Sequence, residues 1–278
     1  MKGKLKIAVA KLVNSIRRAE PPNMKRLFAG ATDTGCVRSA NQDSYHIDPE
    51  GRFFVVADGM GGHAGGEVAS KIAVDSIRAC LEALWDVETD IQKLMQDAIS
   101  KANQAIINDQ AANPVRSDMG TTIVVLLFRD EQPWYSHIGD SRLYRLRGAK
   151  LDQISEDHTW IARAIQTGVV NPEEAKSHPW RHMLLQCLGR EDVKATPARE
   201  IEWQPGDRFL ICSDGLTEEL SDDRIAHHLK GIRNCQQAAQ TLIESAKLRG
   251  GRDNITVVIV SNELNQNSQD DYSCYAEA

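Results

Sequence analysis

Two kinds of apolar periodicity alternate along the chain and predict most of its secondary structure. Apolar residues recur at helical spacing in three stretches, which predicts helices over residues 69–84, 91–106 and 238–246. The spacing of Thr89 and Gln92 is typical of a capping box at the start of the second helix, and Gly250 with Gly251 indicates the end of the third. Continuous apolar runs rich in β-prone residues predict strands over residues 53–57, 121–128, 134–138, 143–146, 208–212 and 255–260.

The links between the middle strands are short and favour antiparallel pairing. Residues 130–133 and 139–141 each connect two consecutive strands, and so few residues allow hairpins but no helical crossover. Apolar runs without polar alternation indicate strands that are buried on both faces. Since the helices are grouped between the strands, we expect an α+β fold of two packed antiparallel sheets with helices on their outer sides.

The segments outside these elements are polar or basic. Residues 156–198 form a long polar connection, which in a compact domain is typical of a lid or binding loop. Residues 1–26 predict a basic amphipathic helix that ends at two prolines. Such a helix either contacts an anionic membrane or a partner, or is a mobile or self-docked extension. Residues 262–278 are rich in Asn, Gln, Asp and Ser, which predicts a disordered tail after a main domain over residues 27–261.

Composition narrows the class of protein. A chain of 278 residues can bury one substantial core, and the net charge of −6 is divided between +7 in the first 28 residues and −13 in the rest. The acidic body disfavours a nucleic-acid surface and suits a cation site. No apolar run has the length of a membrane span, and no cleavage site follows the short apolar run near the start. Six cysteines without a C-x-x-C pair indicate free thiols in a reducing cytoplasm.

Four aspartates lie where predicted strands begin or end: Asp43, Asp58, Asp214 and Asp253. An ionised carboxylate at the mouth of a buried sheet loses hydration, so several that converge there call for a cation. Ligands that are all oxygen favour magnesium or manganese over zinc or copper. Gly59, directly after Asp58, leaves room for a backbone carbonyl to approach such an ion.

Two ions held by shared aspartates would generate a hydroxide at neutral pH and bind the oxygens of an in-line displacement, as in metallophosphatases and nucleases. Arg38 lies five positions before Asp43, where its guanidinium could bind a phosphate through two hydrogen bonds. Taken alone, an Asp-Gly pair is more often a turn and an arginine more often an exposed salt bridge. The prediction therefore depends on their combination.

Six strings occur in a fixed order along the chain: GCVRSANQD (35–43), VVADGMGG (55–62), GTT (120–122), GDSR (139–142), SDG (213–215) and GRDN (251–254). Together they resemble the motifs of the PPM, or PP2C-type, protein serine/threonine phosphatases, and most closely those of small bacterial, especially cyanobacterial, single-domain members. The resemblance spans about residues 27–261. It implies an αββα sandwich with a flap over about residues 156–198 and two catalytic manganese or magnesium ions at one end.

The resemblance also implies roles for individual residues. Asp58 would bridge both ions, the carbonyl of Gly59 would bind one of them, and Asp214 and Asp253 would complete the other.

Further roles follow from the same resemblance. Arg38 would bind the phosphate of the substrate, and Asp43 would orient metal-bound water from outside the ligand set. Bacterial members carry a third, weaker ion, which here would lie between Asp214 and Asp118, with Asp140 as a further contributor.

The implied reaction is hydrolysis of phosphoserine and phosphothreonine by direct attack of a metal-bridging hydroxide, without a phosphoenzyme. Eukaryotic relatives have a histidine where this chain has Met60. A metal-bound water, or His63, would then have to protonate the leaving alkoxide, and a structural role in its loop is the simpler interpretation of His63.

Two histidines of the predicted flap have the spacing of a zinc pair. Pro179 lies between His178 and His182 and interrupts a regular helix, which favours ordinary loop roles for both. For Trp160 and Trp180, packing is the simpler interpretation than binding of substrate.

Other hydrolase classes fit the sequence less well. No cysteine is followed six positions later by an arginine, and neither a G-x-S-x-G string nor a P-loop is present. Two alternatives stay open: a catalytically silent PPM-like scaffold that binds phosphoproteins, and a metal-dependent nuclease or small-molecule phosphatase. We expect a monomeric cytoplasmic enzyme whose partners are phosphorylated proteins and an opposing serine/threonine kinase, with no nucleic acid.

Overall fold

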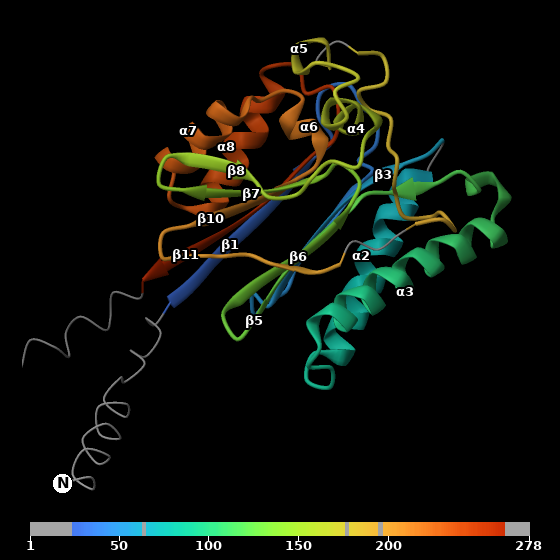
Figure 1. The fold of residues 1–278 in the computed structure, drawn as a ribbon, viewed down its shortest axis with the longest axis horizontal. Coiled ribbons are helices and arrows are strands. Elements are labelled where there is room, and N and C mark those ends of the chain that lie inside the picture. The colour runs from blue at the N-terminus through green and yellow to red at the C-terminus, as the bar shows by residue number, and fades with distance from the viewer. Residues whose placement is uncertain (1–23, 63–64, 176–177, 194–196, 265–278) are drawn as a thin grey trace, which may run out of the picture.

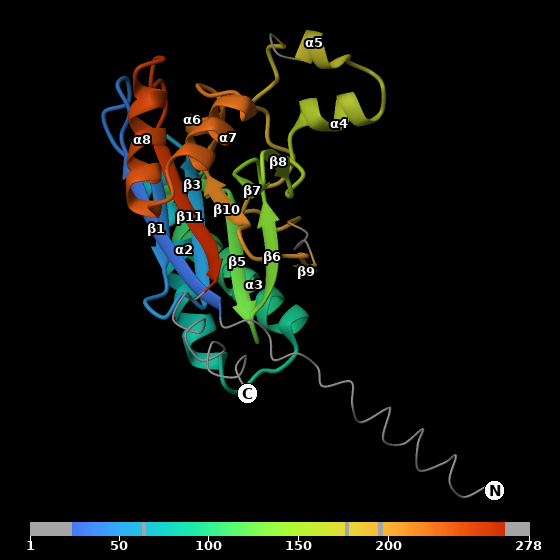
Figure 2. The same ribbon diagram turned by 90° about the vertical axis from the view of Figure 1, so that its left-hand side faces the viewer.

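The computed structural model describes residues 24–62, 65–175, 178–193 and 197–264. Two antiparallel sheets lie face to face in this part of the chain (Figures 1 and 2). The first, sheet A, contains in spatial order β1 (Met24–Asp33), β11 (Ile255–Leu264), β10 (Arg208–Cys212), β7 (Arg142–Arg147) and β8 (Lys150–Gln153). The second, sheet B, contains β2 (Asp43–Ile47), β3 (Phe53–Met60), β5 (Ile123–Arg129), β6 (Gln132–Ile138) and β9 (Arg199–Glu200), with β4 (Gly120–Thr121) paired to β3.

Helices cover the outer face of each sheet. The outer face of sheet B packs against α2 (Gly65–Leu84) and α3 (Ile91–Ala112). The outer face of sheet A packs against α7 (Asp222–Gly231) and α8 (Cys235–Lys247). Four short helices lie in the connections: η1 (Pro114–Arg116), α4 (Trp160–Gln166), α5 (Pro172–Ala175) and α6 (Asp214–Thr217). The predicted αββα sandwich is confirmed.

Strand β3 shows why the strands have apolar runs. Phe54 and Val56 lie in the core between the two sheets, whereas Phe53, Val55 and Ala57 lie in the core beneath α2 and α3. All five are fully buried. Because successive side chains point to opposite faces and both faces are covered, a central strand must be apolar at every position.

One of the two predicted hairpins is present and the other is not. Strands β5 and β6 form a hairpin, with Asp130 and Glu131 in its turn at φ of 50° and 65°. The link through Gly139 to Ser141 instead carries the chain from β6 in sheet B to β7 in sheet A, so the prediction of a hairpin there was wrong. A three-residue link can also cross between packed sheets, which lie only about 10 Å apart.

The three predicted helices are confirmed as α2, α3 and α8, but the predicted cap of α3 was wrong. The N-cap is Asp90 and not Thr89, because the Asp90 side chain accepts hydrogen bonds from the backbone N–H groups of Gln92 and Lys93. Periodicity missed the edge strands β1, β2, β8 and β9, and the helices α4 to α7.

Strand pairing extends the domain beyond the predicted boundaries. Strand β1 begins at Met24, and it pairs along its whole length with β11, which reaches Leu264. Asn262, at the start of the predicted tail, is only 1% exposed and belongs to this pairing. Residues 1–23 and 265–278, which include most of the predicted extension and tail, lie outside the described residues.

None of the helices in the described ranges has the length and apolar character needed to cross a membrane.

Candidate active site

Four of the predicted site residues meet at one end of the sandwich. Asp43 is the first residue of β2 and lies directly opposite Asp58 of β3 in the antiparallel register. Asp214 follows β10 and Asp253 precedes β11, and these two strands are antiparallel neighbours. The end of one strand and the start of the next therefore lie at the same edge of sheet A.

The backbone of Asp58 is held by two threonines of the GTT string. Its N–H donates to the Thr122 hydroxyl at 3.0 Å, and its carbonyl accepts from the Thr122 N–H and the Thr121 hydroxyl, both at 2.8 Å. The Thr122 hydroxyl lies a further 2.7 Å from that of Ser141, in the link between the sheets. Three separate motifs thus fix the position from which the Asp58 side chain projects.

The carboxylate of Asp43 is buried and only half satisfied. Its Oδ2 accepts hydrogen bonds from the hydroxyls of Ser213 at 2.7 Å and Thr256 at 2.6 Å. Its Oδ1 is buried without a hydrogen-bond partner among the described residues. Leaving a buried acceptor without a partner costs about 1–3 kcal/mol of stability, so this oxygen is suited to accept a hydrogen bond from water or to contact a cation.

Asn254 fixes the loop that carries Arg38. Its Oδ1 accepts from the Gln42 N–H at 2.8 Å, and its Nδ2 donates to the carbonyls of Thr34 and Ala40 at 3.0 and 2.9 Å. The Asp214 side of the site packs on the same residue, because a Cβ at Gly215 would lie 2.0 Å from the Asn254 carbonyl oxygen. Asn254 therefore joins the two halves of the site.

Packing explains why residue 59 is a glycine. A Cβ at this position would lie 1.9 Å from the Gly66 carbonyl oxygen and 2.6 Å from that of Gln42, so only glycine lets α2 begin this close to β3. The role of the Gly59 carbonyl as a ligand stays a prediction.

Burial and mutual repulsion raise the pKa values of the clustered carboxyl groups. The pKa values of Asp58 and Asp214 lie well above 3.8, first because of burial and then because of neighbouring aspartates. Burial likewise raises the pKa values of Asp43 and Asp140 to about 6. Asp214 also has a buried Oδ1 without a partner in the described part of the chain. Carboxylates in this state fit divalent ions, because a cation offsets both the lost hydration and the repulsion.

Arg38 lies beside these carboxylates with a half-exposed side chain. Its Nη2 donates to Asp253 Oδ2 at 2.7 Å, which holds the half-exposed guanidinium beside the carboxylates. This position supports its predicted contact with a phosphate.

The residues predicted for the outer ion lie in different surroundings. Asp118 is exposed, between η1 and β4. The described residues contain one cluster of ligand atoms within 4.8 Å of each other, and it consists of His182, Asp214 and Glu218 without Asp118. His182 Nδ1 lies 2.7 Å from Glu218 Oε1, whereas His178 stacks on Trp160.

This placement bears on three predictions. The two histidines of the flap do not form a zinc pair with each other. The pairing of Asp118 with Asp214 stays a prediction. His63 lies outside the described residues.

Comparison with known proteins identifies the family to which the chain belongs. The sequence profile of the family described as protein phosphatase 2C matches residues 37–250. The chain belongs to the protein phosphatase 2C family. The serine/threonine protein phosphatase PstP of Mycobacterium tuberculosis is 39% identical to this PP2C-family chain over 234 residues, which are 84% of this chain and 44% of PstP. The serine/threonine phosphatase Stp of Listeria monocytogenes is 33% identical over 248 residues, which are 86% of this chain and 97% of Stp.

A solved structure supports the fold of the PP2C-family chain. The catalytic domain of PstP in complex with two manganese ions superposes with a TM-score of 0.76 and 36% identity, over 87% of this chain and all of that domain. The PP2C-family chain thus spans less than half of full-length PstP but nearly all of the shorter relative.

Sequence reasoning missed several residues that support the site. In the sequence, Ser213 and Asn254 stand out only as neighbours of predicted ligands and Thr256 only as part of a predicted strand, although their side chains orient Asp43 and the Arg38 loop. The sequence predicts an ordinary loop role for His182, whose ring lies beside Glu218 and Asp214. Two of these residues could have been found from the sequence: Ser213 in the SDG string and Asn254 in the GRDN string are polar residues that directly adjoin buried strands.

The metal-free PP2C-family protein should become less stable as the pH rises. Asp43 has a pKa of about 6 when folded and about 3.9 when unfolded, so the folded state binds the proton more tightly. Ionisation between pH 4 and 7 should therefore remove roughly 2–3 kcal/mol of the free energy of unfolding. Urea unfolding in EDTA at pH 4 and pH 7.5 measures this loss.

The variant Asp43→Asn isolates this effect from other titrations. Its free energy of unfolding should change less between the two pH values than that of the wild type, and manganese should restore the wild type at pH 7.5. Equal pH dependence in both proteins would contradict the assignment.

Proposed function

We propose that the chain is a manganese- or magnesium-dependent protein serine/threonine phosphatase. The observation that carries this proposal is the convergence of Asp43, Asp58, Asp214 and Asp253 beside Arg38, with carboxyl pKa values raised by burial and repulsion. Family membership and the serine/threonine phosphatases among its relatives support the substrate class. The manganese ions in the PstP structure support the choice of metal.

In the proposed site, Asp58, the carbonyl of Gly59, Asp214 and Asp253 hold two divalent ions. This donor set is all oxygen and therefore suits hard cations. Bound there, the ions supply activation of water at neutral pH and neutralisation of charge on the phosphoryl oxygens. A third, weaker ion at Asp214, with Asp118 and Asp140 as contributors, stays part of the proposal.

The chain's own groups position the reactants. Ser213 and Thr256 hold one oxygen of Asp43, which leaves the other to accept a hydrogen bond from the attacking water and orient it toward phosphorus. Arg38 binds the nonreacting phosphate oxygens as charge develops on them. Met60 has no proton to donate, so the leaving alkoxide would take its proton from water or from His63.

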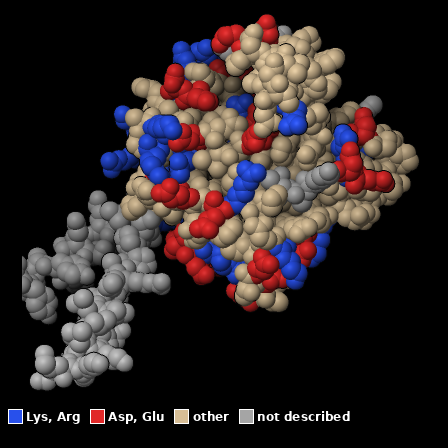
Figure 3. All heavy atoms as spheres, in the orientation of Figure 1, with Lys and Arg blue, Asp and Glu red and all other residues tan. Residues whose placement is uncertain are grey.

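The central test compares three substrates with manganese and with excess EDTA. A phosphothreonine peptide and p-nitrophenyl phosphate should be hydrolysed only when manganese is present, and a dinucleotide should not be cleaved. Acidic and basic side chains lie side by side on the face in Figure 3, without the single sign expected for a nucleic-acid surface. Hydrolysis that persists in EDTA would refute the proposal, and tight peptide binding without hydrolysis would favour a silent scaffold.

Replacing Arg38 should weaken substrate use without unfolding the protein. We expect Arg38→Ala to lower kcat/KM for a phosphopeptide by about 10- to 100-fold, because a charge-assisted contact to phosphate contributes about 1.5–3 kcal/mol. Arg78→Ala on the exposed side of α2 is the matched control. Steady-state kinetics of both variants measure the effect, and equal values for them would contradict the role of Arg38.

An opposing kinase, a cytoplasmic location and a monomeric state also belong to this proposal. Copurification with a serine/threonine kinase, fractionation and light scattering would examine them.

A further inference from the structure

The flap, residues 156–198, exposes large apolar side chains. Trp180 is 51% exposed, Met183 45% and Leu185 43%. We call these three side chains the apolar ledge. Scattered exposed apolar residues are ordinary, but three within six positions of one loop indicate a contact surface.

Backbone pairing gives the apolar ledge a defined shape. The Trp160 N–H donates to the Met183 carbonyl and the Leu185 N–H to the His158 carbonyl, both at 2.8 Å. A β-bridge joins Thr159 to residue 184 between these bonds. Alternation along this paired segment places Met183 and Leu185 on the same side.

The indole of Trp180 is also held. It meets the ring of Trp160 edge-on, with 4.9 Å between the ring centroids. The ledge is therefore preorganised, which reduces the entropy lost when a partner binds to it.

The ledge borders the candidate active site. His182 lies in the chain between Trp180 and Met183, and its Nδ1 contacts Glu218 Oε1 at 2.7 Å. A ring nitrogen of His182 also lies within 4.8 Å of a carboxylate oxygen of Asp214. Figures 1 and 2 both show α4 and α5 of the flap at the end of the sheets where α6 lies. Met183 of the ledge directly follows His182, so the Cα atoms of the two residues lie roughly 3.8 Å apart. His182 in turn lies beside Asp214 and Glu218 of the site.

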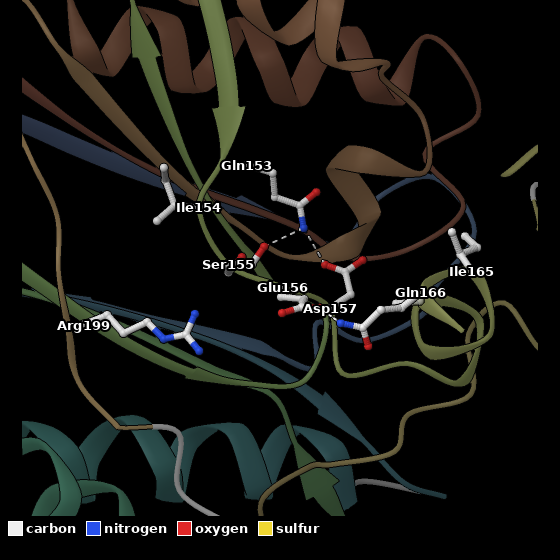
Figure 4. Close-up of a pocket in the computed structure, with 9 residues that line it drawn as sticks. Gln153, Ile154, Ser155, Glu156, Asp157, Ile165, Gln166 and Arg199 are labelled. Carbon is white, nitrogen blue, oxygen red and sulfur yellow. Dashed lines mark hydrogen bonds between the residues drawn. The ribbon is translucent and has the colours of Figure 1, made fainter. Parts of the chain in front are cut away.

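A cleft beside α4 is less suited to hold an apolar side chain of a peptide. It has a volume of about 480 Å³ and lies between α4, the end of β8 and β9 (Figure 4). The polar groups that line it largely bind each other: Gln153 donates to Asp157, and Gln166 donates to Glu156.

We propose that the apolar ledge binds an apolar side chain of the phosphoprotein substrate, within about three residues of the phosphorylated serine or threonine. This inference rests on the proposed function and names a determinant of its substrate. When the phosphate lies at the carboxylate cluster, the residues that flank it in the peptide can reach the flap, because His182 next to the ledge also lies beside Asp214. An extended peptide advances about 3.3 Å per residue, so a few residues span this distance. The occupant is therefore a substrate segment with Leu, Ile, Met or Phe near the phosphate.

Two matched phosphothreonine peptides test the inference. One has leucine at the positions flanking the phosphothreonine, and the other has serine there. The wild-type protein should show about 10-fold higher kcat/KM for the leucine peptide, a difference typical of burying one or two apolar groups. The variants Trp180→Ala and Met183→Ser should reduce this ratio to near one.

Two control variants carry the same kind of change elsewhere. Val169→Ser alters an exposed flap residue outside the ledge, and Leu248→Ser alters an exposed residue at the end of α8. Both should keep the wild-type ratio. Thermal unfolding checks that each variant is folded, and Met183→Ser decides the matter if Trp180→Ala disturbs the flap.

The outcomes separate the inference from the proposed function. Hydrolysis of both peptides at equal rates by the wild type would overturn the ledge and leave the phosphatase intact. Reduced turnover of both peptides by the same factor in the ledge variants would show that the flap shapes the site without choosing the substrate. Failure to hydrolyse either peptide or p-nitrophenyl phosphate with manganese would overturn the proposed function, and the ledge with it.

Discussion

Replacing Asp58 with asparagine should lower phosphatase activity by about 10³-fold or more while the chain stays folded. Asp58 lies opposite Asp43, and its pKa is raised first by burial and then by the charges of Asp43 and Asp214. An amide has the same shape but no charge, so it can neither bridge two cations nor be repelled by its neighbours. The hydrogen bonds from Thr121 and Thr122 are expected to remain, because they involve only the backbone of residue 58.

Two measurements and a control define this prediction. Turnover of p-nitrophenyl phosphate across a manganese titration should stay low at every concentration. Unfolding in EDTA at pH 7.5 should show Asp58→Asn to be at least as stable as the wild type, since one buried repulsive charge is gone. Asp86→Asn, an exposed carboxylate after α2, should behave as the wild type. An Asp58→Asn protein that keeps a tenth of the activity would exclude a bridging role.

Replacing Arg208 with methionine should lower the free energy of unfolding by about 3 kcal/mol. Arg208 is 8% exposed on β10, and its guanidinium donates to the carbonyls of Leu229 and Ile232 at the end of α7 and to the Ser261 hydroxyl. Carbonyls at a helix C-terminus lack partners within the helix and favour a positive charge. Methionine fills similar volume but leaves them unpaired.

Urea unfolding measures this second effect. The midpoint should fall without a change in the m-value, because the surface exposed on unfolding is nearly the same. Arg224→Met on the exposed side of α7 is the control and should change stability by less than about 0.5 kcal/mol. A similarly small loss for Arg208→Met would mean that water replaces the guanidinium at these carbonyls.

The link from β6 to β7 shows how the fold builds the site. Because this link crosses from sheet B to sheet A, it passes over the end where the aspartates meet. Ser141 in the link hydrogen-bonds the threonine that holds Asp58, and Asp140 there has its pKa raised first by burial. A hairpin within one sheet would have kept both residues away from the opposite sheet.

Sequence alone determined the layers and the principal carboxylates. Strands enclosed on both faces must be apolar throughout, and amphipathic helices must place apolar residues on one side, so both leave a pattern in the chain. Asp58 and Asp214 stood out because a charged residue that adjoins such a strand is costly unless something neutralises it.

The tertiary structure decided which sheet each strand joins and which distant groups meet. Asp43 accepts hydrogen bonds from side chains 170 and 213 positions away, and His182 of the flap reaches Glu218. The local pattern around Asp43 or His182 contains no trace of these partners. Apolar periodicity indicates whether a residue is buried. The hydrogen-bond partner of a buried polar atom depends instead on how the layers pack, because that partner can come from any distant segment of the chain.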